Sequence, residues 1–146
     1  MLTLNKDLLY YISNFLDDES VSNLSQTCQK LKKYYNDDFY KYRFYSFYKI
    51  YIDAEIEINP LRENWTFYYL KIVDCLSTND FLQTYKCIIL QDRLDILNLL
   101  INKNCMPTHA WERTMFYQAL YLSLFDRIQN KSFLYLKNKR NSILSF

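Results

Sequence analysis

Apolar residues recur every three or four positions over the first part of the chain. They fall at Leu4, Leu8, Leu9, Ile12, Phe15 and Leu16. This is the spacing of one face of an amphipathic helix, and Asn5 stands where a side chain can cap the first turn. The polar residues 17–20, Asp-Asp-Glu-Ser, end the pattern. Because acidic and hydroxyl side chains suit the positive end of a helix dipole, they indicate the start of a second helix.

The same spacing continues along the second segment. Its apolar positions are Val21, Leu24, Cys28, Leu31 and Tyr35. They predict a second helix that ends near Asn36, and Asp37 and Asp38 then repeat the acidic signal for the start of a third, aromatic-rich helix. Two amphipathic helices joined by so short a connection must pack on each other or on a partner. We therefore expect a small three-helix unit that the third segment closes.

Residues 39–51 combine aromatic side chains with Lys41, Arg43 and Lys49. Such a mixture can stack on single-stranded nucleic acid and pair with its phosphates. We favour the simpler interpretation that the aromatic side chains pack the third helix while the basic groups reach water. Residues 50–58 then alternate between apolar and mostly acidic positions, as in a strand. Because no second strand is evident to pair with them, an extended linker and an isolated edge strand both stay open.

The rest of the chain carries helical patterns separated by short polar turns. Asn59 and Pro60 form a start signal, because proline is well tolerated at the first position of a helix. The expected helices cover Pro60 to about Leu76, about 80–90, 94–103, 108–128 and a short segment within 132–146. Helices joined by turns of a few residues pack as antiparallel pairs.

Composition favours an all-α fold. The 146-residue chain contains no glycine and two prolines. Sandwiches, barrels and glycine-cradled nucleotide sites need residues that tolerate positive φ, so this composition disfavours them. Helix ends that glycine would close need another left-handed residue, and asparagine is the next best. We expect Asn36, Asn104 and Asn138 in this role.

The order of the N-terminal residues carries a family resemblance. The relevant positions are Leu4, Asp7, Ile12, Leu16-Asp17, Leu24 and Cys28-Gln29-Lys30. They resemble the F-box, in which a leucine, a proline and an acidic residue precede an isoleucine, a leucine–aspartate turn, a leucine-rich helix and a cysteine before basic residues. Phe39-Tyr40 is similar to the aromatic position that follows. Two positions depart from the pattern, because Asn5 replaces the usual proline and Leu31 the frequent tryptophan.

The resemblance implies a functional organisation. Residues 2–49 would form the F-box, 50–59 a linker and 60–146 a helical domain that recruits a target protein. F-box proteins bind a Skp-type adaptor, which joins them to the cullin scaffold of a RING-type ubiquitin ligase. The box and its adaptor contact would be formed by Leu4, Leu8, Leu9, Ile12, Phe15, Leu16, Leu24 and Cys28. The alternative is a stand-alone helical interaction module, such as a viral or parasite adaptor or inhibitor, with no link to ubiquitin.

Residues 94–101 resemble the second helix of an ankyrin repeat. On that alignment Asp92 and Asn104 replace the two usual glycines, and Lys86 and Ile88 replace the usual histidine and alanine of the first helix. A repeat period of about 33 residues predicts a further helical pair downstream, but the residues there do not recreate the repeat signature. We expect packed antiparallel helical pairs that are ankyrin-like or irregular.

The chain lacks the residue patterns of catalytic and metal sites. His109 is the only histidine, so histidine-based acid–base chemistry would depend on it. Cys105 and His109 have part of the spacing of a zinc site, but a second close pair of ligands is missing. We therefore expect a non-enzyme with no metal and no cofactor.

Net charge and hydropathy limit the cellular compartments and the classes of partner that we expect for this protein. The net charge of +2 creates no strong field toward nucleic acid or an anionic membrane. Neither a signal-peptide pattern nor an apolar run near the roughly 20 residues of a membrane-spanning helix is present. The four scattered cysteines are interpreted as reduced side chains. We expect an intracellular protein of the cytoplasm or nucleus, in the host cytoplasm if the source is viral, with protein partners rather than membrane or nucleic acid.

Overall fold

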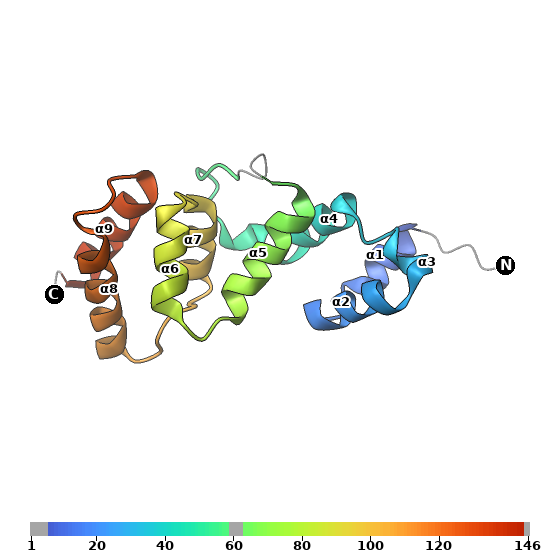
Figure 1. Ribbon diagram of the computed structural model, residues 1–146, viewed down its shortest axis with the longest axis horizontal. Coiled ribbons are helices and arrows are strands. Elements are labelled where there is room, and N and C mark those ends of the chain that lie inside the picture. Colours follow the sequence, from blue (N-terminus) through green and yellow to red (C-terminus); the bar gives the residue numbers. More distant parts are fainter. Residues whose placement is uncertain (1–5, 59–62, 145–146) are drawn as a thin grey trace. The chain divides into compact units, whose positions relative to one another are not determined.

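The part of the protein that the structure describes is mainly helical. The computed structural model describes residues 6–58 and 63–144, and this part consists of helices and connecting turns with no β-strand (Figure 1). The all-α fold class expected from the sequence is therefore confirmed. Within the same residues, no helix combines the length and the apolar character that crossing a bilayer would require.

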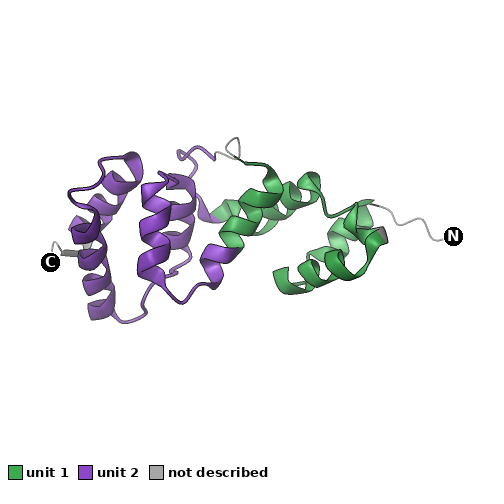
Figure 2. Ribbon diagram, in the orientation of Figure 1, with its two compact units in different colours: residues 1–50, 59–73 green, residues 51–58, 74–146 purple. Residues whose placement is uncertain are grey.

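The chain divides into two compact units (Figure 2). Unit 1 comprises residues 1–50 and 59–73, and unit 2 comprises residues 51–58 and 74–146. Helix α5, Trp65–Ser77, belongs to unit 1 as far as Val73 and to unit 2 beyond it. The functional domains expected at 2–49, 50–59 and 60–146 concern binding roles, and their boundaries stay predictions.

Unit 1 begins with short helices where longer ones were expected. They are α1 (Lys6–Ser13), α2 (Asp18–Thr27), α3 (Gln29–Lys32) and α4 (Asp37–Phe47), followed by the 3-10 turn η1 (Lys49–Tyr51). The prediction of one continuous second helix as far as Asn36 is wrong, because Cys28 has extended backbone angles (φ −120°, ψ 104°) and separates α2 from α3. The last turns of α2 are rich in Ser, Asn and Thr, whose side chains compete for backbone groups. Thr27 does so, since its Oγ1 donates to the Asn23 carbonyl oxygen at 2.8 Å.

The predicted helix starts depend on side-chain caps that the structure contains. Asp17 Oδ1 accepts the Ser20 amide at 2.7 Å at the start of α2, and Asn36 Oδ1 accepts the Phe39 amide at 3.2 Å at the start of α4. Helix α5 begins later than expected, because Asn64 Oδ1 accepts the Phe67 amide at 2.9 Å and Trp65 is the first helical residue. The start signal at residues 59–60 lies outside the described residues.

Aromatic side chains from α4 and α5 form the core of unit 1. Phe39 and Phe44 of α4 are fully buried, as is Tyr68 of α5. The Phe44 ring meets the Tyr68 ring edge-on at 5.3 Å and lies 5.6 Å from the Trp65 ring. The inward side of the aromatic stretch thus packs the unit, while basic side chains such as Lys41 stay exposed.

Residues 51–58 are not a strand. They form a turn in which the Ile56 amide donates to the Asp53 carbonyl oxygen at 3.0 Å. Helix α7 holds this turn by two asparagines: Asn98 Oδ1 accepts the Asp53 amide at 2.8 Å, and Asn102 Nδ2 donates to the Tyr51 carbonyl oxygen at 2.6 Å. The alternating sequence had suggested an extended segment, but its backbone groups bond to α7 side chains instead of to a second strand.

Unit 2 is built from two pairs of helices. They are α6 (Phe81–Leu90), α7 (Leu94–Asn102), α8 (Ala110–Leu124) and α9 (Lys131–Leu144). Within the pairs, α6 packs on α7 and α8 on α9, and between the pairs α6 packs on α8 and α7 on α9 (Figure 1). The apolar residues of α7 fill the middle of this unit, and Ile96, Leu97, Leu99 and Leu100 are fully buried.

Two residues of unit 2 adopt the left-handed conformation that glycine usually takes. They are Asp92, with φ 53°, and Asn104, with φ 57°, and each stands two residues after the end of a helix, α6 or α7. The prediction for Asn104 is therefore confirmed. The predictions for Asn36 and Asn138 are wrong, because Asn36 has extended angles at the start of α4 and Asn138 lies inside α9. Both Asn36 and Asn104 follow a helical stretch, so sequence spacing alone does not separate a residue that closes one helix from a residue that opens the next.

Candidate functional site

Beyond its charged first residues, Lys6 and Asp7, helix α1 has one apolar side that is covered and another that is exposed. Leu9 and Tyr10 are buried in unit 1. The exposed side carries Leu8, Tyr11 and Ile12, and Phe15 in the turn after α1 continues it; these four residues are 51%, 60%, 46% and 75% exposed in chain order. We call these four residues the α1 face. Large apolar side chains gathered at one exposed site are typical of a surface that a partner covers.

The structure distinguishes among the predicted adaptor-binding residues. Leu8, Ile12 and Phe15 lie together on the α1 face, whereas Leu9 is only 5% exposed and helps to form the core. The remaining predicted residues that the structure describes, Leu16, Leu24 and Cys28, are half-buried. Leu4 lies outside the described residues.

Sequence reasoning missed Tyr11. It stands three positions after Leu8 and four before Phe15, which is helical spacing for the same face. Its ring meets the Phe15 ring edge-on, with centroids 5.3 Å apart. A tyrosine beside a leucine-rich pattern was not counted as apolar, although its ring contributes a large apolar area.

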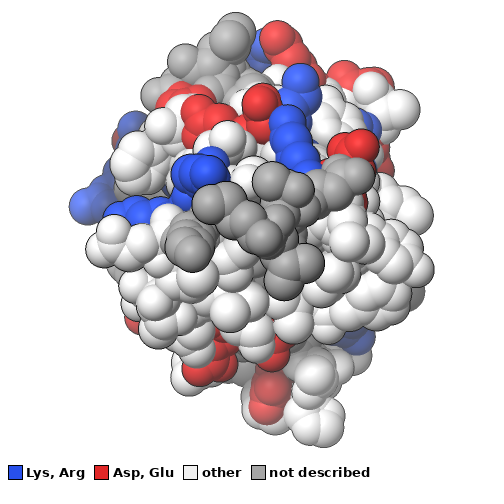
Figure 3. Space-filling model, turned by 90° about the vertical axis from the view of Figure 1, so that its right-hand side faces the viewer, with Lys and Arg blue, Asp and Glu red and all other residues white. Residues whose placement is uncertain are grey.

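Charged residues are unevenly distributed over one side of the protein. Figure 3 views the protein from the side on which α1–α3 lie in Figure 1. It shows residues that are neither basic nor acidic over much of the lower half of the view, with charged groups mainly in the upper half and along the bottom edge. Depletion of charged residues is a feature of the buried core of protein–protein interfaces.

A buried arginine fixes the end of α1. Arg43 of α4 is 2% exposed, and its guanidinium donates from Nη1 to the Ser13 carbonyl oxygen and from Nη2 to the Leu16 carbonyl oxygen, each at 2.6 Å. Its Nε lies 3.0 Å from Asp18 Oδ1 and 2.9 Å from the Tyr69 hydroxyl. The cation therefore joins α1, α2 and α5 to α4, and its donors meet acceptors as a buried charge requires.

Asp18 completes this buried cluster from the start of α2. Its carboxylate pairs with Arg43 and also accepts hydrogen bonds from the hydroxyls of Tyr48 and Tyr69. Burial, together with this carboxylate, raises the pKa of both tyrosines well above the usual range. Both hydroxyls consequently stay protonated and remain donors to Asp18 at neutral pH. We call Arg43, Asp18, Tyr48 and Tyr69 the Arg43 cluster.

A second contact ties the same turn to α4. Asn14 Nδ2 donates to the Tyr42 hydroxyl oxygen at 2.9 Å. The residues before and after Phe15 are thus both tethered, through the side chain of Asn14 and the carbonyl oxygen of Leu16, while the Phe15 ring points into solvent. Sequence reasoning counted Arg43 among the exposed basic residues of α4, which is wrong. A clue was available, since Arg43 precedes the apolar Phe44 and falls four positions after Phe39.

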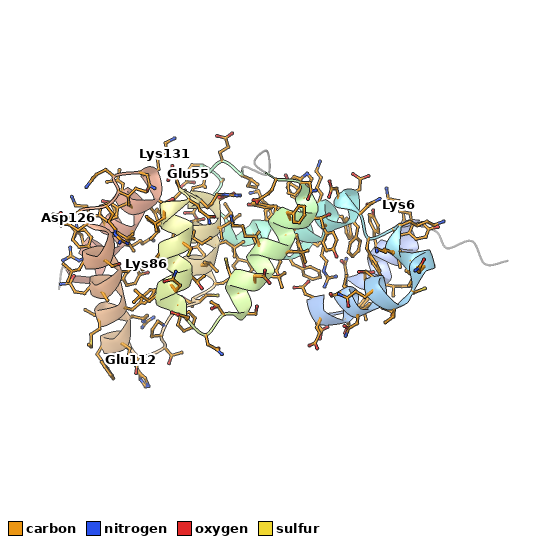
Figure 4. All side chains as sticks on the ribbon, viewed as in Figure 1. Lys6, Glu55, Lys86, Glu112, Asp126 and Lys131 are labelled. Carbon is orange, nitrogen blue, oxygen red and sulfur yellow. The ribbon has the colours of Figure 1, made fainter. Side chains whose placement is uncertain are left out.

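Unit 2 has an apolar surface of its own on α8. The exposed residues of this helix are Ala110, Trp111, Met115, Ala119 and Leu122. All five are apolar, and we call them the α8 face. Glu112, near the start of the helix, is half-buried, and Asp126 lies in the turn after it (Figure 4). Apart from the partly exposed Glu112 and Arg113 of its first turn, α8 carries no charged side chain, which is unusual on a surface that only contacts water.

The residues with metal-binding or nucleophilic potential lie apart from one another. Residues 6–58 and 63–144 contain no group of three or more His, Cys, Asp and Glu side chains that could hold a metal ion. The four cysteines are thiols and form no disulfide; burial raises the pKa of the Cys105 thiol, which keeps it protonated. His109 is exposed and precedes α8 without a capping hydrogen bond from its side chain.

Comparison with known proteins gives no matching family model, no similar curated protein and no similar solved structure. Functional inference therefore depends on the residues and the geometry described above.

Proposed function

We propose that the chain is a non-catalytic substrate-recognition subunit of a cullin-RING ubiquitin ligase. Its N-terminal helices would act as an F-box that binds a Skp-type adaptor, and its C-terminal helices would recruit a target protein. The proposal combines the F-box resemblance of residues 4–30 with the physical character of the surface that those residues form.

The exposed α1 face is the observation that carries the proposal. Three of the residues singled out by the resemblance, Leu8, Ile12 and Phe15, share this face and are accessible to a partner. Recognition of an apolar helix face by a groove of a partner is a common mode of protein association. Aromatic side chains at the centre of an interface often contribute most of the binding free energy, and Tyr11 and Phe15 provide such a pair.

Unit 2 supports the recruiting role in two ways. The α8 face offers a second apolar surface, distinct in sequence from the F-box. The helical pair α6–α7 is also similar to an ankyrin repeat in backbone conformation, since Asp92 and Asn104 both adopt left-handed angles. These are the two positions at which the ankyrin pattern has glycine, and glycine is favoured there because it alone has no Cβ to clash. We interpret unit 2 as an ankyrin-like helical module on this basis.

An adaptor-binding experiment tests the proposal. The full chain and its Ile12→Asp variant are titrated with a purified Skp-type adaptor in a calorimeter. We expect the variant to bind at least about 30-fold more weakly, because a carboxylate would be desolvated at the centre of the interface. Its helical circular dichroism should stay near that of the parent, since Ile12 is 46% exposed.

The matched control places the same substitution elsewhere in unit 1. Ile50→Asp changes a side chain that is 84% exposed and lies outside the α1 face, so adaptor affinity should not change. Equal affinity of the Ile12→Asp variant and the parent would refute the F-box assignment. Failure of the parent chain to bind would favour a stand-alone helical interaction module.

A further inference from the structure

The ring of Phe15 is the most exposed part of the α1 face, and the backbone on both sides of it is bonded to one buried cation. We propose that Arg43 is a positioning residue that holds the turn between α1 and α2 so that Phe15 is presented to the partner in a fixed orientation. The binding consequence rests on the proposed function, whereas the conformational consequence concerns unit 1 alone.

The turn has weak local support. Residues 14–16 follow the last residue of α1, and the Phe15 and Leu16 amides donate to the Ile12 and Ser13 carbonyl oxygens at 3.0 Å and 3.1 Å. Such short-range bonds at a helix end fray readily. Phe15 itself is 75% exposed, and its described ring contact is with Tyr11, which is also exposed. The position of the ring must therefore be set through the backbone.

The Arg43 guanidinium supplies the missing support. The carbonyl groups at the C-terminal end of a helix lack partners within the helix. Here the carbonyl oxygen of Ser13, the last residue of α1, accepts Nη1 in addition to the Leu16 amide, and the Leu16 carbonyl oxygen in the turn accepts Nη2, one on each side of Phe15. A planar guanidinium can reach two acceptors at once in a fixed geometry, and an ammonium group cannot reproduce this. The negative end of the helix dipole also favours a cation at this place.

The guanidinium is itself immobilised. Its Nε is bonded to Asp18 and Tyr69, and its central carbon lies 4.8 Å from the centroid of the Phe47 ring. Arg43, which belongs to α4 and is bonded to α2 and α5, thus fixes the turn relative to these three helices. A partner would meet a ring whose backbone was already ordered on folding, so less conformational entropy would be lost on binding.

The first test measures the turn without any partner. Arg43→Lys in the full chain keeps a cation beside Asp18 but cannot bridge both carbonyl oxygens. Hydrogen exchange of the Phe15 and Leu16 amides is followed by NMR and compared with that of Tyr48, whose amide closes α4 by donating to the Phe44 carbonyl oxygen at 2.8 Å. We expect exchange about tenfold faster at Phe15 and Leu16 and changed by less than about twofold at Tyr48.

A matched substitution in unit 2 controls for the loss of an arginine. Arg140 Nε donates to Gln118 Oε1 and its guanidinium lies 4.1 Å from the Tyr121 ring centroid, so Arg140→Lys also removes a guanidinium contact between helices. It should leave exchange at Phe15 and Leu16 unchanged. Unchanged exchange in the Arg43→Lys variant would overturn the proposal. Equal acceleration at all amides of unit 1 would overturn it too, because Arg43 would then only stabilise the unit.

The second test asks whether Arg43 acts through Phe15 in binding. A purified Skp-type adaptor is titrated with the parent, Arg43→Lys, Phe15→Ala and the double variant, and with the same series on Leu8→Ala. Arg43→Lys should weaken binding about tenfold in the parent and in Leu8→Ala, but less than about twofold in Phe15→Ala.

The two tests separate the positioning proposal from the proposed function. The same tenfold loss in the Phe15→Ala background would show that Arg43 does not act through Phe15. If the parent chain binds no adaptor, the proposed function fails, and the exchange experiment still decides whether Arg43 positions the turn.

Discussion

Tyrosine accounts for 15 of the 146 residues, and several of its hydroxyls lie inside the protein. In unit 1, Tyr48 and Tyr69 donate to Asp18. In unit 2, the Tyr85 hydroxyl donates to the Cys105 carbonyl oxygen at 2.6 Å, and the Tyr117 hydroxyl lies 3.8 Å from the Met106 sulfur. A neutral phenol can be buried in this way because its ring is apolar and its single proton finds an acceptor.

The buried phenols predict a loss of stability in strong base. Burial raises the pKa of Tyr117 from 10.0 to about 12, and it raises the pKa values of Tyr48, Tyr69 and Tyr85 further. The unfolded chain releases these protons near pH 10 and the folded chain does not, so their contribution is complete below pH 10 and falls as the pH rises toward and above 12.

Urea unfolding measured at several pH values checks this expectation, and the near-ultraviolet absorbance of tyrosinate gives the state of the phenols. The urea concentration at the midpoint of unfolding should be constant from neutral pH to about pH 9.5 and decrease above it. Tyrosinate absorbance should rise in two stages, first from exposed rings and then together with unfolding. Complete ionisation of all tyrosines near pH 10 with the fold intact would contradict the burial of these hydroxyls.

At the scale of elements, a chain without glycine must turn by other means. Asp92 and Asn104 take left-handed angles after α6 and α7, and short polar side chains tolerate this region better than other side chains do. Elsewhere the chain uses N-terminal caps, as at Asp17, Asn36 and Asn64. Helix ends are therefore encoded in acidic and amide side chains, which explains why most helix starts could be predicted.

Asn104 provides a test of this encoding. Asn104→Ala should lower the free energy of unfolding by about 1 kcal/mol, because a Cβ without a compensating polar group is disfavoured at positive φ. Asn104→Gly should have equal or greater stability than the parent, since glycine adopts this region without strain. Denaturant unfolding measures both. Asn138→Ala, inside α9, is the control and should be neutral or slightly stabilising; equal losses in both alanine variants would contradict the role of Asn104.

The elements that sequence reasoning missed have two different physical causes. Periodicity gives the apolar positions of residues 21–35 but contains no signal for the extended backbone at Cys28, which depends on weak helix formers before it. The alternation of residues 50–58 resembles a strand, yet a strand needs a partner, and the amides of Asn98 and Asn102 bind this backbone instead. The break at Cys28 depends on local helix propensity, which apolar spacing does not report, whereas the turn at 51–58 depends on contacts between residues distant in sequence.

The sequence predicted the candidate site only in part, because helical spacing does not show which contacts form between residues distant in sequence. Helical spacing placed Leu8, Ile12 and Phe15 on one side of α1, but it could not show that Leu9 faces inward. The role of Arg43 was hidden, because its acceptors are backbone carbonyl groups 27 and 30 positions away in sequence. Such a contact depends on the packing of α4 against the end of α1.

At the scale of the whole molecule, each unit has an apolar surface as well as an apolar core. The α1 face belongs to unit 1 and the α8 face to unit 2. A protein that links two partners needs separate surfaces whose substitution affects one interaction at a time. The arrangement predicts that changes on the α8 face leave both the fold and adaptor binding intact.

Leu122→Lys tests that independence. Leu122 is 67% exposed, so the free energy of unfolding should change by no more than about 0.5 kcal/mol, and adaptor affinity should equal that of the parent. Leu120→Lys, two positions earlier on the buried side of α8, should destabilise the protein by more than about 3 kcal/mol, because it buries an unpaired ammonium group. Urea denaturation separates the two variants. Similar losses from both would show that α8 is covered on its outer side within the monomer.

The placement of the two tryptophans gives the protein a built-in pair of optical reporters. Trp65 is half-buried in unit 1, where its indole lies 5.6 Å from the Phe44 ring, whereas Trp111 is 63% exposed on the α8 face of unit 2. Their emission differs in colour and in access to a dissolved quencher, because one indole is surrounded by rings and the other by water. Light emitted by the unlabelled protein can thus distinguish an event in one unit from an event in the other.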